Sequence, residues 1–146
     1  MHTGPHLHFK GNCREAFNFY AETFGGRIVF QMTYGEAPGA EQTPPEVRNQ
    51  IIHARIDLDG QFLLGCDTPT GYQPPQGFNV MAAVEKPAEA ERIFKALADG
   101  GQITMPFQET FWAHRFGMCT DRFGTPWMVN CEKPLAEVAA AARKSA

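Results

Sequence analysis

Two segments of the chain repeat their apolar residues with helical spacing. In residues 13–24 and again in residues 87–98, apolar side chains recur at intervals of three and four residues. Asn12 stands where an N-cap would precede the first helix, and Gly25 stands where a left-handed residue would end it. The spacing therefore predicts two amphipathic helices, each with one face to bury.

Alternation of apolar and polar residues marks the strands. We expect eight of them, near residues 6–10, 27–34, 49–58, 61–66, 78–84, 102–106, 115–120 and 126–131. Two segments rich in Gly and Pro, 36–46 and 67–77, interrupt the series, and the first is long enough to form a flap. An alanine-rich run predicts a final helix over about 134–144.

The order of these elements occurs twice. The string EAFNFYAETFGG at 15–26 is similar to EAERIFKALADGG at 89–101, and the Asp-x-x-Gly turn at 57–60 recurs at 121–124. Each half thus reads strand, helix, strand, strand, strand. We infer a single domain over 1–146, with one module at about 4–66, a linker at 67–77 and a second module at about 78–132.

A βαβββ module of this kind covers one face of its sheet with a helix and leaves the other face bare. Neither module has enough core alone, so we expect the two sheets to lie side by side. The predicted fold is α+β, an open mixed barrel whose helix-free faces line a shared cleft. Such a cleft is the first place to look for a ligand.

Composition narrows the function. The 146 residues carry 13 Lys and Arg against 16 Asp and Glu, a net charge of −3, and 43% are apolar, as in a globular domain. No basic excess indicates nucleic acid, and no apolar run reaches the roughly 18 residues of a membrane span. We find no signal peptide, and therefore expect a cytoplasmic protein with free cysteines.

Polar side chains share one side of two expected strands. His6 and His8 alternate on the first strand, and His53, Arg55 and Asp57 alternate on the strand at 49–58. A histidine within reach of an arginine and an aspartate can carry a proton near neutral pH, so His53 is our best candidate for a catalytic residue. The alternative is that these side chains only line a wet cleft or a solvated strand edge.

The segment ETFWAHR at 109–115 offers a second candidate surface. Phe111 and Trp112 supply flat apolar area, and Arg115 supplies a planar fork for a carboxylate or phosphate. Together they suit a small anionic or aromatic ligand. In the alternative arrangement, Trp112 fills its own cleft while Arg115 pairs with Glu109.

Four strings carry a resemblance to known proteins. They are FKGNCREAFNFYAETFGG at 9–26, YGEAP at 34–38, IIHARIDLDG at 51–60 and MPFQETFWAHRFGMCTDRFGTPWMVN at 105–130. With the repeat, they resemble the vicinal-oxygen-chelate superfamily, which includes glyoxalase I and the bleomycin- and fosfomycin-resistance proteins, and more closely its PhnB-like branch. Thr125-Pro126 departs from the His-Arg or similar pair that the family usually has there.

The resemblance implies positions for the superfamily's divalent metal. Carried through the repeat, they fall on His6 (or on Pro5, if one loop differs by a residue), Leu64, Asn79 and Met128. Leucine offers no donor atom, and a methionine thioether suits soft metals only. We therefore expect no metal site of the usual kind and no cofactor, while a divalent ion with atypical ligands stays open as the alternative.

These observations favour a protein that binds a small anionic or aromatic molecule without a metal. The residues we expect to contact it are His6, His8, His53, Arg55, Phe111, Trp112, Arg115, Met128 and Asn130. The alternative is an enzyme, either a metal-dependent lyase, isomerase or dioxygenase with atypical ligands or a metal-free acid–base catalyst using His53. The resemblance also implies a homodimer.

Overall fold

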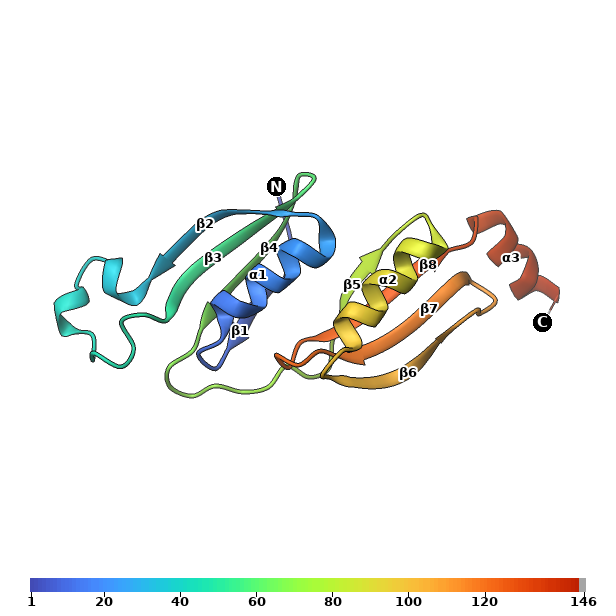
Figure 1. Cartoon of the computed structure of the whole chain (residues 1–146). Coiled ribbons are helices and arrows are strands. Elements are labelled where there is room, and N and C mark those ends of the chain that lie inside the picture. Colours follow the sequence, from blue (N-terminus) through green and yellow to red (C-terminus); the bar gives the residue numbers. More distant parts are fainter. Residues whose placement is uncertain (145–146) are drawn as a thin grey trace. The chain divides into compact units, whose positions relative to one another are not determined.

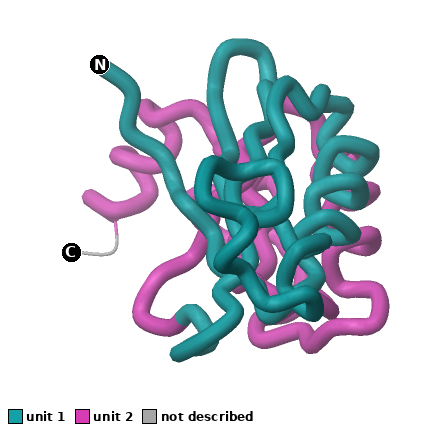
Figure 2. The backbone as a smooth tube through the Cα atoms, turned by 90° about the vertical axis from the view of Figure 1, so that its left-hand side faces the viewer, with its two compact units in different colours: residues 1–75 teal, residues 76–146 magenta. Residues whose placement is uncertain are grey.

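The chain divides into two units, Met1–Pro75 and Gln76–Ala146, drawn in teal and magenta in Figure 2. The computed structural model describes residues 1–144. Each unit contains a four-stranded mixed sheet, not closed into a barrel, with one helix lying across one of its faces (Figure 1). The predicted α+β fold with two βαβββ modules is confirmed.

The first unit follows the predicted order. Its elements are β1 (His6–Phe9), α1 (Cys13–Phe24), β2 (Arg27–Thr33), the short 3₁₀ helices η1 (Tyr34–Glu36) and η2 (Ala40–Gln42), β3 (Ile51–Leu58) and β4 (Gln61–Asp67). The strands lie in the order β1-β4-β3-β2, and β1 runs parallel to β4. The predicted flap, 36–46, begins at the last residue of η1 and contains η2, and β4 extends to the first residue of the predicted linker.

The second unit repeats this topology. Its elements are β5 (Val80–Ala83), α2 (Pro87–Ala98), β6 (Gln102–Gln108), β7 (Ala113–Thr120) and β8 (Pro126–Glu132), followed by α3 (Leu135–Lys144). The strands lie in the order β5-β8-β7-β6, with β5 parallel to β8. Within residues 1–144, no helix is long and apolar enough to cross a bilayer.

Apolar side chains between sheet and helix form the core of each unit. In the first, Leu7 and Phe9 of β1 are almost completely buried, beside Phe17 and Tyr20 of α1. The Phe17 ring lies so close to Gly65 that a Cβ there would be 2.6 Å from a ring carbon. Because Leu7 and Phe9 point to the helix, His6 and His8 point to the other face of the sheet.

The start of α1 corrects the sequence analysis. Asn12 makes no side-chain capping bond, although its position predicted one. Asp67, at the end of β4, accepts instead, from the backbone N–H of Cys13 at 2.9 Å and of Gly11 at 3.0 Å. A carboxylate from a distant strand therefore holds the helix start, while Gly25 ends the helix at φ 68° as expected.

Candidate functional site

Polar side chains of β1, β3 and β4 lie together on the helix-free face of the first sheet. Strand pairing places His6 opposite Leu64 and His8 opposite Cys66, and it places Arg55 on the other side of Leu64. His53 lies two residues before Arg55 and so falls beside Cys66. We call this set the histidine face: His6, His8, His53, Arg55, Leu64 and Cys66.

The imidazole of His6 lies next to those of both His8 and His53. The ring centroids of His6 and His8 are 5.1 Å apart, and those of His6 and His53 are 6.0 Å apart in a stacked arrangement. Burial lowers the pKa of His6, and the neighbouring charges of His8 and His53 lower it further. His6 therefore favours its neutral form, in which one ring nitrogen can accept a hydrogen bond or bind metal.

Cys66 belongs to this cluster, and the sequence analysis did not connect it to the histidines. Its Sγ lies 3.6 Å from Nδ1 of His8, which also lies 2.9 Å from Oγ1 of Thr68. Burial raises the pKa of the Cys66 thiol, the hydrogen bond with Thr68 opposes that shift, and Asp67 adds to it. The sequence could have predicted this contact. If β1 and β4 pair in parallel, the outward residues 6, 8, 64 and 66 lie side by side.

Arg55 is held flat on an aromatic ring. Its guanidinium carbon lies 3.6 Å from the centroid of Phe62, a cation–π contact. Its buried Nε has no hydrogen-bond partner among residues 1–144. Asp57, expected beside His53, lies at the turn instead and accepts from the backbone N–H of Gly60 at 2.7 Å. The structure therefore brings His53 to other histidines rather than to a carboxylate.

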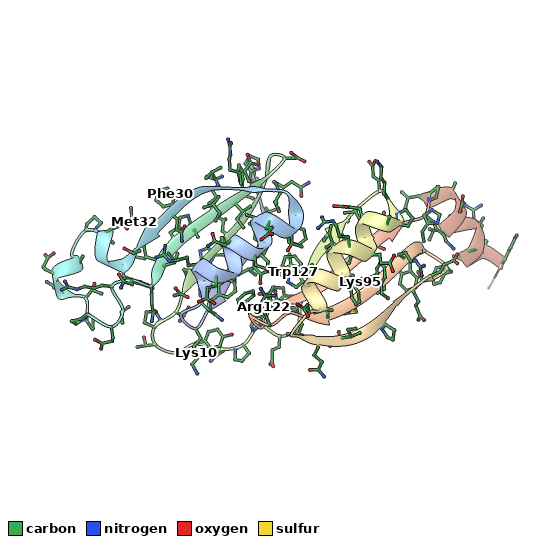
Figure 3. The ribbon with its side chains drawn as sticks, viewed as in Figure 1. Lys10, Phe30, Met32, Lys95, Arg122 and Trp127 are labelled. Atoms are coloured by element: carbon green, nitrogen blue, oxygen red, sulfur yellow. The ribbon has the colours of Figure 1, made fainter. Side chains whose placement is uncertain are left out.

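An apolar border lies beside the histidine face. Phe30 and Met32 of β2, labelled in Figure 3, pair with Arg55 and His53 respectively. The Phe30 ring centroid is 5.6 Å from that of His53, and 43% of the Phe30 side chain is exposed. A ligand on the histidine face would therefore meet apolar surface along β2.

The predicted residues of the second unit do not all share a face. Met128 and Asn130 of β8 lie on the helix-free side, and Trp112 packs edge-on against Phe116, 5.2 Å between centroids. Asn130 is buried, and its Oδ1 has no hydrogen-bond partner among residues 1–144. Phe111 is largely exposed beside Trp112.

Arg115 lies apart from that group. A register shift in β7 pairs it with Cys131, and its guanidinium carbon lies 5.9 Å from the ring of Phe107. Phe107 stacks on Phe94 of α2, so Arg115 is on the helix side of the sheet. The alternative, in which Arg115 pairs with Glu109, does not hold either, because Glu109 accepts from Lys133 at 2.7 Å.

Two βαβββ modules with one helix each are the fold of glyoxalase-type proteins. The fosfomycin resistance protein FosX of Listeria monocytogenes shares this fold with a TM-score of 0.64, at 10% identity, over 94% of this chain and 99% of that one. The chain belongs to the PhnB-like family. The family model that matches residues 2–130 is described as 3-demethylubiquinone-9 3-methyltransferase.

Several relatives span nearly the whole chain. Protein YjdN of Escherichia coli K12 is 37% identical over 142 residues, 91% of this chain and 97% of that protein. The structure of PA1353 from Pseudomonas aeruginosa is 41% identical with a TM-score of 0.84, covering 92% of this chain and 99% of that one. A Bacillus cereus PhnB protein, titled a putative 3-demethylubiquinone-9 3-methyltransferase, is 26% identical with a TM-score of 0.74 and covers 89% and 98%.

The methyltransferase description finds no support in the fold. A usual nucleotide-binding methyltransferase needs a glycine-rich loop that opens a helix after a strand. Here Gly25 and Gly100 have left-handed φ values of 68° and 73°, and each follows a helix. Within residues 1–144, these glycines serve to end α1 and α2.

The superfamily's usual metal does not fit this chain. Register places His6 opposite Leu64 and Met81 opposite Met128, so Met81 rather than the expected Asn79 is the counterpart of His6. Two thioethers, one alkyl side chain and one imidazole are not ligands for a hard divalent ion that polarises substrate oxygens. We therefore derive no chemistry through a metal at these positions.

Proposed function

We propose that the protein binds a small anionic molecule on the histidine face of the first unit. The observation that carries this proposal is Arg55, whose guanidinium is fixed on Phe62 while its buried Nε lacks a partner among residues 1–144. A buried unsatisfied donor is costly unless something accepts from it. A carboxylate, phosphate or phosphonate oxygen is the acceptor that a guanidinium fork binds best.

The surroundings of Arg55 favour an anion with an apolar part. The histidine face itself contains three imidazoles and no carboxylate, so an approaching anion meets donors rather than like charge. Phe30 and Met32 supply apolar area beside the imidazoles. The ligand class is therefore a small carboxylate, phosphate or phosphonate that carries an alkyl or aromatic group.

Residues of the second unit form a further part of the proposal. Met128, Asn130, Trp112 and Phe111 present apolar surface and one buried amide oxygen without a partner among residues 1–144. We propose that they form an apolar contact surface of the second unit for a small aromatic molecule, and Trp112→Ala tests this surface separately. Arg115 lies over Phe107 and is left out of the proposed site.

A titration with inorganic phosphate, phenylphosphonate and benzoate tests the anion site, with binding followed by amide chemical shifts. We expect Arg55→Gln to weaken binding about 10-fold or more, the loss of one charge-assisted hydrogen bond. Arg115→Gln is the matched control, since it removes the same charge from another site. Equal weakening by both variants, or shifts that avoid β1, β3 and β4, would show that the histidine face is not the binding site.

We also propose a homodimer. Exposed apolar side chains on the outermost strands β2 and β6 support it, among them Val29 and Ile103. Light scattering on the purified protein tests this, and a monomer mass at micromolar concentration would contradict it.

A further inference from the structure

We propose that His6, His8 and Cys66 bind a transition-metal ion of the zinc type. One ligand atom from each of the three lies within 4.8 Å of the others, on the exposed side of β1 and β4. This site uses neither Leu64 nor any residue of the second unit. It shares only His6 with the ligand positions that the superfamily implies, and its other two ligands, His8 and Cys66, lie outside that set.

The distance between His8 and Cys66 already matches a zinc tetrahedron. Zinc binds imidazole nitrogen at roughly 2.0–2.1 Å and thiolate sulfur at about 2.3 Å, so two such ligands lie about 3.6 Å apart at a tetrahedral angle. The observed separation of Cys66 Sγ and His8 Nδ1 is 3.6 Å. The remaining ligand, His6, needs only a change of side-chain rotamer to complete the set, because all three atoms lie within 4.8 Å.

The backbone fixes this arrangement. Parallel pairing places His8 directly opposite Cys66, and His6 lies two residues earlier on the same strand, pointing to the same side. The strand is anchored by Leu7 and Phe9, which are buried beneath it. The three ligands are thus presented from two hydrogen-bonded strands rather than from a loop, as a specific site requires.

Ligand chemistry selects the metal class. One thiolate and two imidazoles suit Zn²⁺, Co²⁺ and Cu²⁺, whereas Mg²⁺ and Mn²⁺ favour oxygen. Binding replaces the proton of the Cys66 thiol by a metal–sulfur bond, releases that proton to solvent, and frees the Thr68 hydroxyl from His8 Nδ1. Three protein ligands leave a fourth position for water or another small ligand, with no change in oxidation state.

Titration of the untagged, chelator-treated full chain with Co²⁺ and Zn²⁺ tests the proposal. We expect one ion per chain, a thiolate-to-Co²⁺ charge-transfer band, and little binding of Mn²⁺. Cys66→Ser should abolish the band and weaken Zn²⁺ binding by more than the roughly 100-fold that loss of an outer-shell partner can cost. His8→Gln should do the same.

Matched variants test whether Zn²⁺ binds to histidines or cysteines outside the proposed site. His114→Gln and Cys131→Ser remove the same ligand types from the second unit and should leave Zn²⁺ binding unchanged. His2→Gln tests the N-terminal histidine, which lies 5.5 Å from Phe62. Binding that depends equally on these controls, or that persists in Cys66→Ser, would overturn the proposal.

A second measurement does not depend on the folding of a variant. Zn²⁺ should protect Cys66 of the wild-type protein from alkylation, as read by peptide mass spectrometry. Alkylation at the same rate with and without Zn²⁺ would overturn the metal site. This inference does not rest on the proposed anion site, because Arg55→Gln should leave Zn²⁺ binding intact even if phosphate binding fails.

Discussion

The two units share one frame but carry opposite chemistry on their helix-free faces. When the two sheets are aligned by their strand pairs, Leu64 of β4 corresponds to Met128 of β8. From this alignment, each residue of the histidine face has a counterpart in the second sheet. Met81 is the counterpart of His6, and Ala83 is the counterpart of His8. In the other strands, Phe116 corresponds to His53, Met118 to Arg55 and Asn130 to Cys66. The repeat therefore fixes the backbone, and side-chain substitution gives one face donors and ligands and the other an apolar surface.

The buried carboxylates differ between the units in the same way. In the first unit, Asp67 holds the start of α1 and also accepts from the Ile51 backbone N–H at 2.8 Å. Its counterpart Cys131 has a thiol that donates to the carbonyl oxygen of Glu85, at 3.4 Å. In the second unit the buried carboxylate is Asp121, at the turn, where it accepts from the Trp127 indole at 2.8 Å. Each unit thus places its buried charge at a different end of the sheet.

The largest effect is expected from removing the buried carboxylate. Asp67→Ala leaves the buried backbone donors of Cys13 and Ile51, and the part-buried donor of Gly11, without their acceptor, and should cost about 3 kcal/mol of unfolding free energy. Asp57→Ala, the control at the exposed turn, should cost about 1 kcal/mol or less. Urea denaturation measures both, and equal losses would show that Asp67 does not hold the unit together.

Local pattern was enough to predict the faces of the strands but not the helix cap. Alternation predicted that His6 and His8 share one side of the first strand, and the structure has them there, with Leu7 and Phe9 buried on the other side. The predicted capping bond was wrong because the side chain that accepts from the Cys13 amide is Asp67, 54 residues further along the chain, and not Asn12. No local rule reports a partner so distant, since only the folded sheet brings it to the helix.

Arg115 shows how one bulge moves a residue to the other face. Ala113 pairs with Glu132, yet Arg115 pairs with Cys131, so β7 carries one extra residue at this point. Uninterrupted pairing would have placed Arg115 opposite Asn130, on the helix-free side. Arg115 was grouped with Trp112 because both lie in the segment 109–115, and a bulge leaves no clear mark in a single sequence.

Metal binding would sharpen the difference between the two faces. If the first unit alone binds Zn²⁺, an ion at 100 times its dissociation constant should add about 2.7 kcal/mol of stability. Cys66→Ser should lose this gain, whereas Met118→Leu on the second face should keep it. Thermal melts with and without Zn²⁺ measure the shift, and a gain that survives Cys66→Ser would place the ion elsewhere.

Replacing one residue of the histidine face by its counterpart in the second unit should have a smaller effect. His53→Phe converts the histidine face toward the second unit, where Phe116 occupies the equivalent position. We expect phenylphosphonate affinity to fall by less than about 10-fold, because Arg55 remains. His114→Gln serves as the control in the same titration. If His53→Phe binds phenylphosphonate as tightly as the wild type does, His53 does not contact the ligand.

The smallest expected effect is on pH dependence. Burial, with the charges of His8 and His53, holds the pKa of His6 below its unfolded value of about 6.5, so protonation favours the unfolded chain. The contribution of neutral His6 to the free energy of unfolding is therefore complete above about pH 6.5. It is lost as the pH falls through the pKa of His6 in the folded protein. Comparing urea midpoints at about pH 7.5 and about pH 5.5, His6→Gln should show a smaller decline than the wild type. His114→Gln should decline as the wild type does, and an identical decline in His6→Gln would mean that the imidazole cluster does not resist protonation.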